Sequence, residues 1–204
     1  DLIYNGEQWR VEMYEHPIKN VGGFEFLGHV RSFDNKYYRK AVSRQKPQLV
    51  KPYDLEEFEF TKNQTKRIVK VPITGAYTLM DWSFDEYYIN KYGHLPSLKQ
   101  RKLSARRDLA VDIAREVVRE DIKALVKAGA KIIQIDEPAA STKPEEMSLL
   151  VETFNESVKG INGCKFTMHN CFSDYRLFFP HVLEMKDCAQ FAWELANGDS
   201  HKLG

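Results

Sequence analysis

Short apolar runs alternate along most of the chain with longer segments in which apolar residues recur every three or four positions. The runs predict strands at residues 1–7, 68–74, 131–135, 165–168 and 189–193, and the longer segments predict helices at 54–64, 104–128, 145–158 and 175–185. Residues 9–51 are rich in aromatic and charged side chains, and there we expect a helix turn, a strand and a long loop. Repeated strand and helix units predict an α/β fold with a parallel sheet covered by helices.

Polar side chains recur where the predicted strands end. They are Glu7, Thr74, Asp136, Glu137, His169, Cys171 and Glu194. Such positions converge on one rim of a parallel barrel, and a doubly wound sheet would gather them at its strand ends in the same way. No glycine-rich phosphate turn follows any of these strands, which favours the barrel. Because the strands are too few to close a (β/α)8 TIM barrel, we interpret residues 1–204 as part of a single barrel domain, incomplete and lacking its first and last strands.

The balance of basic and acidic residues indicates which kinds of binding partner to expect. The 204 residues include 30 basic and 29 acidic ones, with a formal net charge of +1, which argues against nucleic acid or an anionic membrane surface. No run approaches the roughly 18 to 20 apolar residues that cross a bilayer, and no signal peptide is visible. We therefore expect a cytoplasmic protein with a small-molecule site.

One group of residues has the chemistry of a metal centre. His169, Cys171 and Glu194 offer imidazole, thiolate and carboxylate, three ligand types that zinc accepts. Alone, the His-x-Cys pair more often reflects a packed histidine beside a buried thiol. Its place at a strand end, and the rarity of a buried glutamate without a partner, favour the metal centre. Cys164 precedes its strand and Cys188 begins one, so both are expected in the core near the opposite rim.

Other strand-end residues suit a charged or flat substrate. Glu7 and Asp136 can accept hydrogen bonds from an ammonium group, although an ion pair with a nearby Lys or Arg is an equal alternative for each. Asp136 and Glu137 are adjacent, so at least one of them must face the rim. Trp82 offers a flat ring for stacking, although core packing is the more frequent role of such a residue.

Five segments, taken together, resemble the cobalamin-independent methionine synthase family in its catalytic C-terminal barrel. They are residues 4–7, 71–84, 133–139, 169–174 and 191–199, in family order. The most specific are Thr-Gly-x-Tyr-Thr-Leu-x-Asp-Trp-Ser and Gln-Ile-Asp-Glu-Pro-Ala, whereas the region between residues 11 and 68 matches poorly. The resemblance implies zinc at His169, Cys171 and Glu194. It also implies a substrate site, with the homocysteine ammonium at the catalytic Glu7 and Asp136 and the methyl-donor pterin near Trp82, and there we also expect Glu137 and Thr74.

The implied reaction is transfer of a methyl group to the zinc-activated thiolate of homocysteine, which forms methionine. The donor is a 5-methyltetrahydrofolate-type pterin or, as in the short archaeal-type members that this chain resembles, a methylcorrinoid protein. The family's fourth zinc ligand, a cysteine, is expected beyond Gly204. Two alternatives stay open: a related zinc barrel that methylates another thiol such as coenzyme M, and a non-catalytic zinc-binding barrel. Glu7 and Asp136 would repel the sulfonate of coenzyme M, which favours homocysteine.

Overall fold

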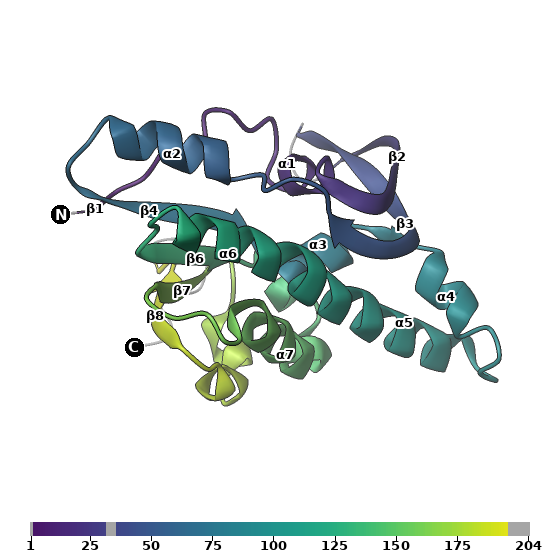
Figure 1. Ribbon diagram of the computed structural model, residues 1–204. Coiled ribbons are helices and arrows are strands. Elements are labelled where there is room, and N and C mark those ends of the chain that lie inside the picture. The colour runs from purple at the N-terminus through teal and green to yellow at the C-terminus, as the bar shows by residue number, and fades with distance from the viewer. Residues whose placement is uncertain (1, 32–35, 196–204) are drawn as a thin grey trace.

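The computed structural model describes residues 2–31 and 36–195 and contains two sheets (Figure 1). The larger sheet has five strands in chain order: β1 (Leu2–Ile3), β4 (Ile68–Thr74), β6 (Ile132–Asp136), β7 (Lys165–Asn170) and β8 (Cys188–Trp193). All neighbouring pairs are parallel. The predicted α/β fold with a parallel sheet is therefore confirmed. Among the described residues the sheet is open, with β1 and β8 at its edges, so the closed barrel stays a prediction.

The pleat of the central strands separates a core face from a polar face. On β6, Ile133 and Ile135 are fully buried, whereas Gln134 and Asp136 are half-buried. This alternation arises because successive side chains of a strand point to opposite faces. The polar face is the one on which a site can be built.

Helices connect the strands of the larger sheet and cover it. They are α2 (Leu55–Asn63), α3 (Ala76–Asp81), α4 (Tyr87–Lys91), α5 (Leu98–Ile113), α6 (Arg119–Lys127) and α7 (Met147–Val158). A π-helical turn, η1 (Ala114–Val118), joins α5 to α6, so the two form one long helix across the molecule (Figure 1). It begins earlier than the predicted residue 104, because Ser97 caps it by accepting a hydrogen bond from the backbone N–H of Gln100 at 3.2 Å.

The helix predicted at 175–185 is wrong. Two 3₁₀ turns, η4 (Tyr175–Phe178) and η5 (His181–Glu184), take its place, and two more, η2 (Ala140–Thr142) and η3 (Pro144–Glu146), precede α7. The break falls at Pro180, which has no backbone N–H to continue a helical ladder.

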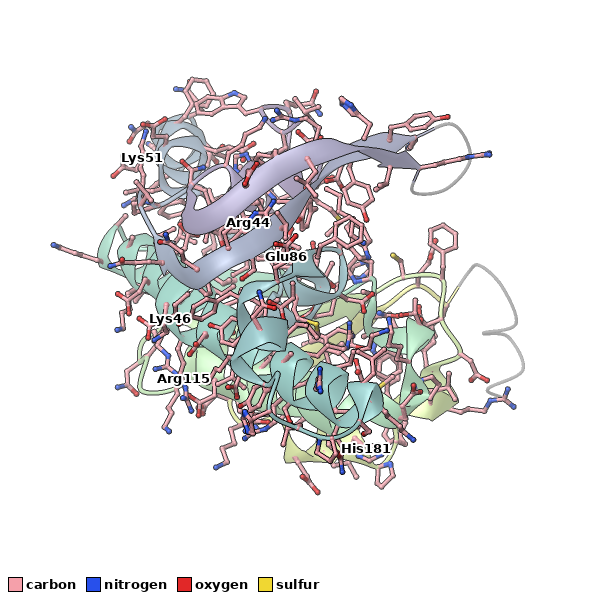
Figure 2. The ribbon with its side chains drawn as sticks, turned by 90° about the vertical axis from the view of Figure 1, so that its right-hand side faces the viewer. Arg44, Lys46, Lys51, Glu86, Arg115 and His181 are labelled. Carbon is pink, nitrogen blue, oxygen red and sulfur yellow. The ribbon has the colours of Figure 1, made fainter. Side chains whose placement is uncertain are left out.

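A long hairpin occupies the region where one strand and a loop were expected. After the short α1 (Glu15–Ile18), β2 (Val21–Arg31) pairs antiparallel with β3 (Tyr37–Leu49), and β5 (Phe84–Asp85) adds to β3 in parallel. The expectation failed because β3 exposes charged residues and shows no apolar run. Its Arg44 pairs with Glu86, which precedes α4 (Figure 2). Its Lys46 pairs with Glu116 of the long helix at 2.8 Å.

The predicted first strand is also shorter than expected. It was placed at residues 1–7, but β1 ends at Ile3, and Asp1 lies outside the described residues. Glu7 therefore does not follow directly on a strand.

No helix in residues 2–31 and 36–195 is both long enough and apolar enough to cross a membrane.

Candidate functional site

A cavity of about 240 Å³ lies on the polar face of the larger sheet. Its lining consists of Tyr4, Glu7, Lys70, Pro72, Gln134, Asp136 and His169. Strand register explains the gathering, because Pro72 pairs with Gln134 and Asp136 pairs with His169 across β4, β6 and β7. Three of the predicted site residues, Glu7, Asp136 and His169, thus share one cavity. Lys70 and Gln134 were missed, although the two-residue period of the strands that carry Thr74 and Asp136 points to them.

Asp136 is held at the cavity with a perturbed pKa. Its Oδ1 accepts a hydrogen bond from Gln134 Nε2 at 2.7 Å. Burial raises the pKa of Asp136 to about 7, and the negative charge of Glu7 adds to the rise while the bond from Gln134 opposes it. The carboxyl group is therefore poised between its two protonation states near neutral pH, which suits a group that receives a cationic ligand.

Glu7 reaches the same cavity from a turn. Its backbone has a φ of 56°, and its N–H donates to Asn5 Oδ1 at 3.0 Å. Glu7 Oε2 lies 3.1 Å from the guanidinium of Arg10, so the ion pair with a nearby Arg that was the alternative for this residue is present. Glu7 nevertheless lines the cavity, and the ion pair and the cavity position coexist.

His169 is fixed in one tautomer at the end of β7. Its Nδ1 lies 2.5 Å from the backbone carbonyl oxygen of Ala192 on β8. Because a carbonyl oxygen only accepts, Nδ1 donates, and Nε2 keeps the lone pair that a metal requires. This is the arrangement expected of a histidine ligand.

Cys171 and Glu194 come together through the segments that follow β7 and β8. Glu194 Oε2 accepts from the backbone N–H of Phe172 at 3.0 Å, and the Tyr175 hydroxyl contacts the backbone N–H of Glu194 at 2.7 Å. Burial raises the pKa of the Cys171 thiol, and the charges of Glu194 and Asp136 raise it further. A thiol and carboxylates that face one another are metal ligands, and a divalent cation would balance their negative charge. The chemistry of these residues therefore fits zinc.

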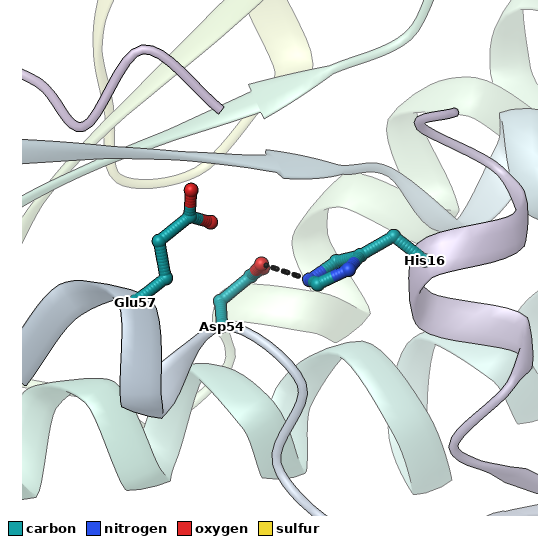
Figure 3. A group of neighbouring side chains, drawn as sticks. All are labelled: His16, Asp54 and Glu57. Carbon is teal, nitrogen blue, oxygen red and sulfur yellow. Dashed lines mark hydrogen bonds and ion pairs between the residues drawn. The ribbon is translucent and has the colours of Figure 1, made fainter. Parts of the chain in front are cut away.

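The three predicted zinc ligands are not tightly gathered. Within the described part of the chain, the group of three ligand atoms that all lie within 4.8 Å of one another is that of His16, Asp54 and Glu57 (Figure 3). This second group was missed from the sequence, because His16 is far along the chain from the other two.

Glu137 faces away from the cavity. It is fully buried and accepts hydrogen bonds from the backbone N–H groups of Tyr77 and Thr78, at 3.1 and 2.7 Å, and from the Thr78 hydroxyl at 2.6 Å. Burial raises the pKa of Glu137 to about 7. In this structure Glu137 caps the N-terminus of α3, and its predicted substrate contact stays a prediction.

Thr74 and Trp82 also make structural contacts. The Thr74 hydroxyl donates to the backbone carbonyl of Met13 at 2.8 Å. The half-buried Trp82 ring stacks on Tyr38 of the hairpin, with 5.4 Å between ring centroids. Cys164 and Cys188, which were expected in the core, are partly buried and pack against it.

The amino-acid sequence matches, over residues 1–188, the family profile described as the catalytic domain of cobalamin-independent synthase. Curated methionine synthases are similar over nearly the whole chain. Those of Thermoplasma acidophilum, Pyrococcus horikoshii and Saccharolobus solfataricus are 41%, 40% and 40% identical, over 98%, 97% and 97% of this chain and 55%, 53% and 55% of their own length. The chain thus spans about half the length of these relatives.

Two solved structures share the fold. A B12-independent methionine synthase from Shewanella sp. W3-18-1, in complex with selenomethionine, superposes with a TM-score of 0.67 at 24% identity, over 85% of this chain and 47% of that one. A vitamin-B12-independent methionine synthase, described as putative, from Listeria monocytogenes gives a TM-score of 0.59 at 16% identity, over 83% and 48%. Residues 196–199, which end the last resembling segment, lie outside the described residues.

Proposed function

Because the chain belongs to the cobalamin-independent methionine synthase family, we propose that it carries the homocysteine and zinc sites of an enzyme that methylates homocysteine to methionine. One observation carries this proposal: Glu7, Asp136 and His169 line a single cavity. Two carboxylates suit the ammonium of an amino acid, and the imidazole lies beside them as a ligand for the metal that binds its thiol.

The five parallel strands form one arc of a (β/α)8 barrel in this proposal, with residues 1–204 as part of that domain. Strand order supports it, because the strands of the larger sheet follow the order of the chain. A doubly wound sheet reverses its order at a switch point, and the binding site lies at that reversal. Here the site lies on three consecutive neighbours instead.

The zinc site consists of His169, Cys171 and Glu194. The free lone pair of His169 Nε2 and the contact between the Cys171 segment and Glu194 support this set. When bound, zinc supplies a thiolate at neutral pH, because a coordinated thiol gives up its proton. Asp136 and Glu7 orient the substrate by holding its ammonium, and Asp136 shifts to its charged form as that cation arrives.

The methyl donor is a 5-methyltetrahydrofolate-type pterin or a methylcorrinoid protein. Trp82, half-buried and stacked on Tyr38, offers a ring against which a pterin can pack. We place the reaction in the cytoplasm, since Cys164, Cys171 and Cys188 are all free thiols, as a reducing compartment keeps them.

A cysteine pair tests the metal site in the full-length protein. We expect Cys171→Ser to retain at least about tenfold less zinc, because an alcohol is a harder and less basic ligand than a thiolate. Methyl transfer to homocysteine should fall with it. Cys188→Ser is the control, because that thiol begins β8 and contacts the backbone carbonyl of Gln190. Zinc content by elemental analysis and methionine formation are the two measurements.

The outcomes separate the alternatives. Equal zinc in Cys171→Ser and the parent would reject the ligand set. If the full-length protein held zinc but transferred a methyl group from neither donor, a non-catalytic barrel would be favoured. If it methylated coenzyme M faster than homocysteine, the proposal that homocysteine is the substrate would be rejected.

A further inference from the structure

We propose that Arg10 is the positioning residue that fixes Glu7 at the cavity, and that the buried carboxylates of Asp54 and Glu57 hold Arg10 in place. This inference rests on the proposed function, because it concerns the site for the substrate ammonium.

Each nitrogen of the Arg10 guanidinium contacts at least one acceptor oxygen. One terminal nitrogen lies 3.1 Å from Glu7 Oε2, Nε lies 3.1 Å from Glu57 Oε2, and the other terminal nitrogen lies 3.0 Å from both Asp54 Oδ1 and the carbonyl oxygen of Pro72. The Arg10 side chain is only 5% exposed. Since the guanidinium is planar and its donors have fixed directions, three contacts determine the position of the fourth. Arg10 therefore sets where Glu7 Oε2 lies.

The carboxylates that hold Arg10 are nearly inaccessible to water. Asp54 and Glu57 are 1% and 3% exposed, and both lie at the start of α2. Buried carboxylates require a cation or hydrogen-bond donors. Here the guanidinium of Arg10 contacts both carboxylates and supplies the cation.

The nearby His16 does not convert this group into a metal site. Its Nε2 lies 3.1 Å from Asp54 Oδ1 (Figure 3) and 3.0 Å from the backbone carbonyl oxygen of Tyr53. Because that carbonyl only accepts, Nε2 carries a proton and has no lone pair for a metal. A divalent ion would also be repelled by the adjacent Arg10. The group is a binding site for a guanidinium.

Glu7 needs this support. Its side chain is 36% exposed and projects from a turn, so without Arg10 it would sample many rotamers. Binding an ammonium between Glu7 and Asp136 would then include the cost of ordering Glu7, and Arg10 removes that cost in advance.

The arrangement leaves Glu7 attractive to a cation. Arg10 is already paired with the carboxyl groups of Asp54 and Glu57, at 3.0 and 3.1 Å, so these two groups offset its positive charge where it meets Glu7. Arg10 thus fixes Glu7 without cancelling its charge.

The test compares two thiols in the full-length zinc-loaded protein. Homocysteine carries an ammonium group, and 4-sulfanylbutanoate has the same thiol and carboxylate without it. We expect Arg10→Lys to weaken homocysteine binding about tenfold by calorimetry, because lysine cannot make the four directed contacts. Binding of 4-sulfanylbutanoate and zinc content should stay unchanged.

Two further variants complete the design. Arg119→Lys is the matched control, because Arg119 also holds a carboxylate, Glu156 at 2.7 Å, outside the cavity, and it should leave both affinities unchanged. Glu57→Gln weakens the contact with Arg10 and leaves the arginine itself in place. It should reduce the affinity for homocysteine several-fold without changing the affinity for 4-sulfanylbutanoate. If Arg10→Lys lowers the thermal midpoint too far for calorimetry, Glu57→Gln supplies the decisive measurement.

If Arg10→Lys weakened the binding of both thiols to the same extent, or of neither, the positioning role of Arg10 would be overturned. If the parent protein itself bound the two thiols equally, the ammonium site would be wrong, and the proposed function would fail there rather than at Arg10.

Discussion

Asp136 and Glu137 are neighbours in the chain with opposite surroundings. Asp136 lines the cavity, whereas Glu137 is buried against the N-terminus of α3. The sequence required at least one of the two to face the rim, since they follow directly on a strand. It did not reveal which one, because the donors that bind Glu137 lie about 60 positions earlier in the chain. Arg10 was missed for the same reason, since its partners Asp54 and Glu57 are distant in sequence.

A prediction at the residue scale concerns Gly75, the N-cap residue that precedes α3. A Cβ at this position would lie 2.1 Å from Glu137 Oε1, closer than any real contact, so the Glu137 side chain would have to leave the N–H groups of Tyr77 and Thr78 that hold it. We expect Gly75→Ala to lower the free energy of unfolding by about 2 to 3 kcal/mol, through the clash and the lost cap. Urea denaturation measures this change.

Gly28→Ala is the control for that substitution. A Cβ on Gly28 meets nothing within 4 Å, so the free energy of unfolding should change by less than about 1 kcal/mol. Equal effects of the two substitutions would contradict the account of the Gly75 contact.

At the scale of elements, periodicity found the parallel strands and the main helices but not the hairpin. Strands β4, β6 and β7 are apolar runs with buried residues, and β8 is an apolar, partly exposed edge strand, and periodicity detects such runs well. Strand β3 is half-exposed, and its charged positions conceal its alternation. The helix expected at 175–185 failed because a single Pro180 outweighs the apolar spacing around it.

The phenol of Tyr14 links the hairpin to the residue that follows Trp82 at the end of α3. The buried Tyr14 hydroxyl lies 2.8 Å from Ser83 Oγ, just beyond α3, and accepts from the backbone N–H of Ala41 on β3 at 3.1 Å. We expect Tyr14→Phe to cost about 1 to 3 kcal/mol, because the Ala41 N–H is left buried without an acceptor. The measurement is the midpoint of chemical unfolding. Tyr38→Phe, which keeps the ring stacked on Trp82, should cost much less, and a similar cost would contradict this reading.

At the scale of the whole molecule, family membership and the parallel sheet were predicted correctly, whereas the barrel, favoured because no glycine-rich turn follows the strands, stays a prediction. The residues themselves predicted that polar side chains gather at one rim. That much follows from strand periodicity, but the depth and charge balance of the cavity depend on side chains from four separate segments.

The cavity also makes stability depend on pH. The pKa of Asp136 is about 7 in the folded protein, against 3.8 for an ordinary aspartate. Between these values the folded protein holds a proton that the unfolded chain has lost, so the free energy of unfolding falls as pH rises from about 4 to about 7 and then levels off. We expect this contribution to amount to about 2 to 4 kcal/mol.

Asp136→Asn isolates that contribution, because asparagine stays neutral. The stability of the variant relative to the parent should increase from pH 4 to pH 8, as urea titrations at the two values would measure. A constant difference would show that Asp136 titrates alike in the folded and unfolded protein.

The cap on α3 has a consequence for folding. Its acceptor, Glu137, directly follows β6, and the N–H of Glu137 bonds to the carbonyl of His169 at the end of β7 at 2.9 Å. The first turn of α3 therefore acquires its cap only once β6 and β7 lie in register. We therefore expect the helix and the two strands to open together, so that local opening of one exposes the amides of the other.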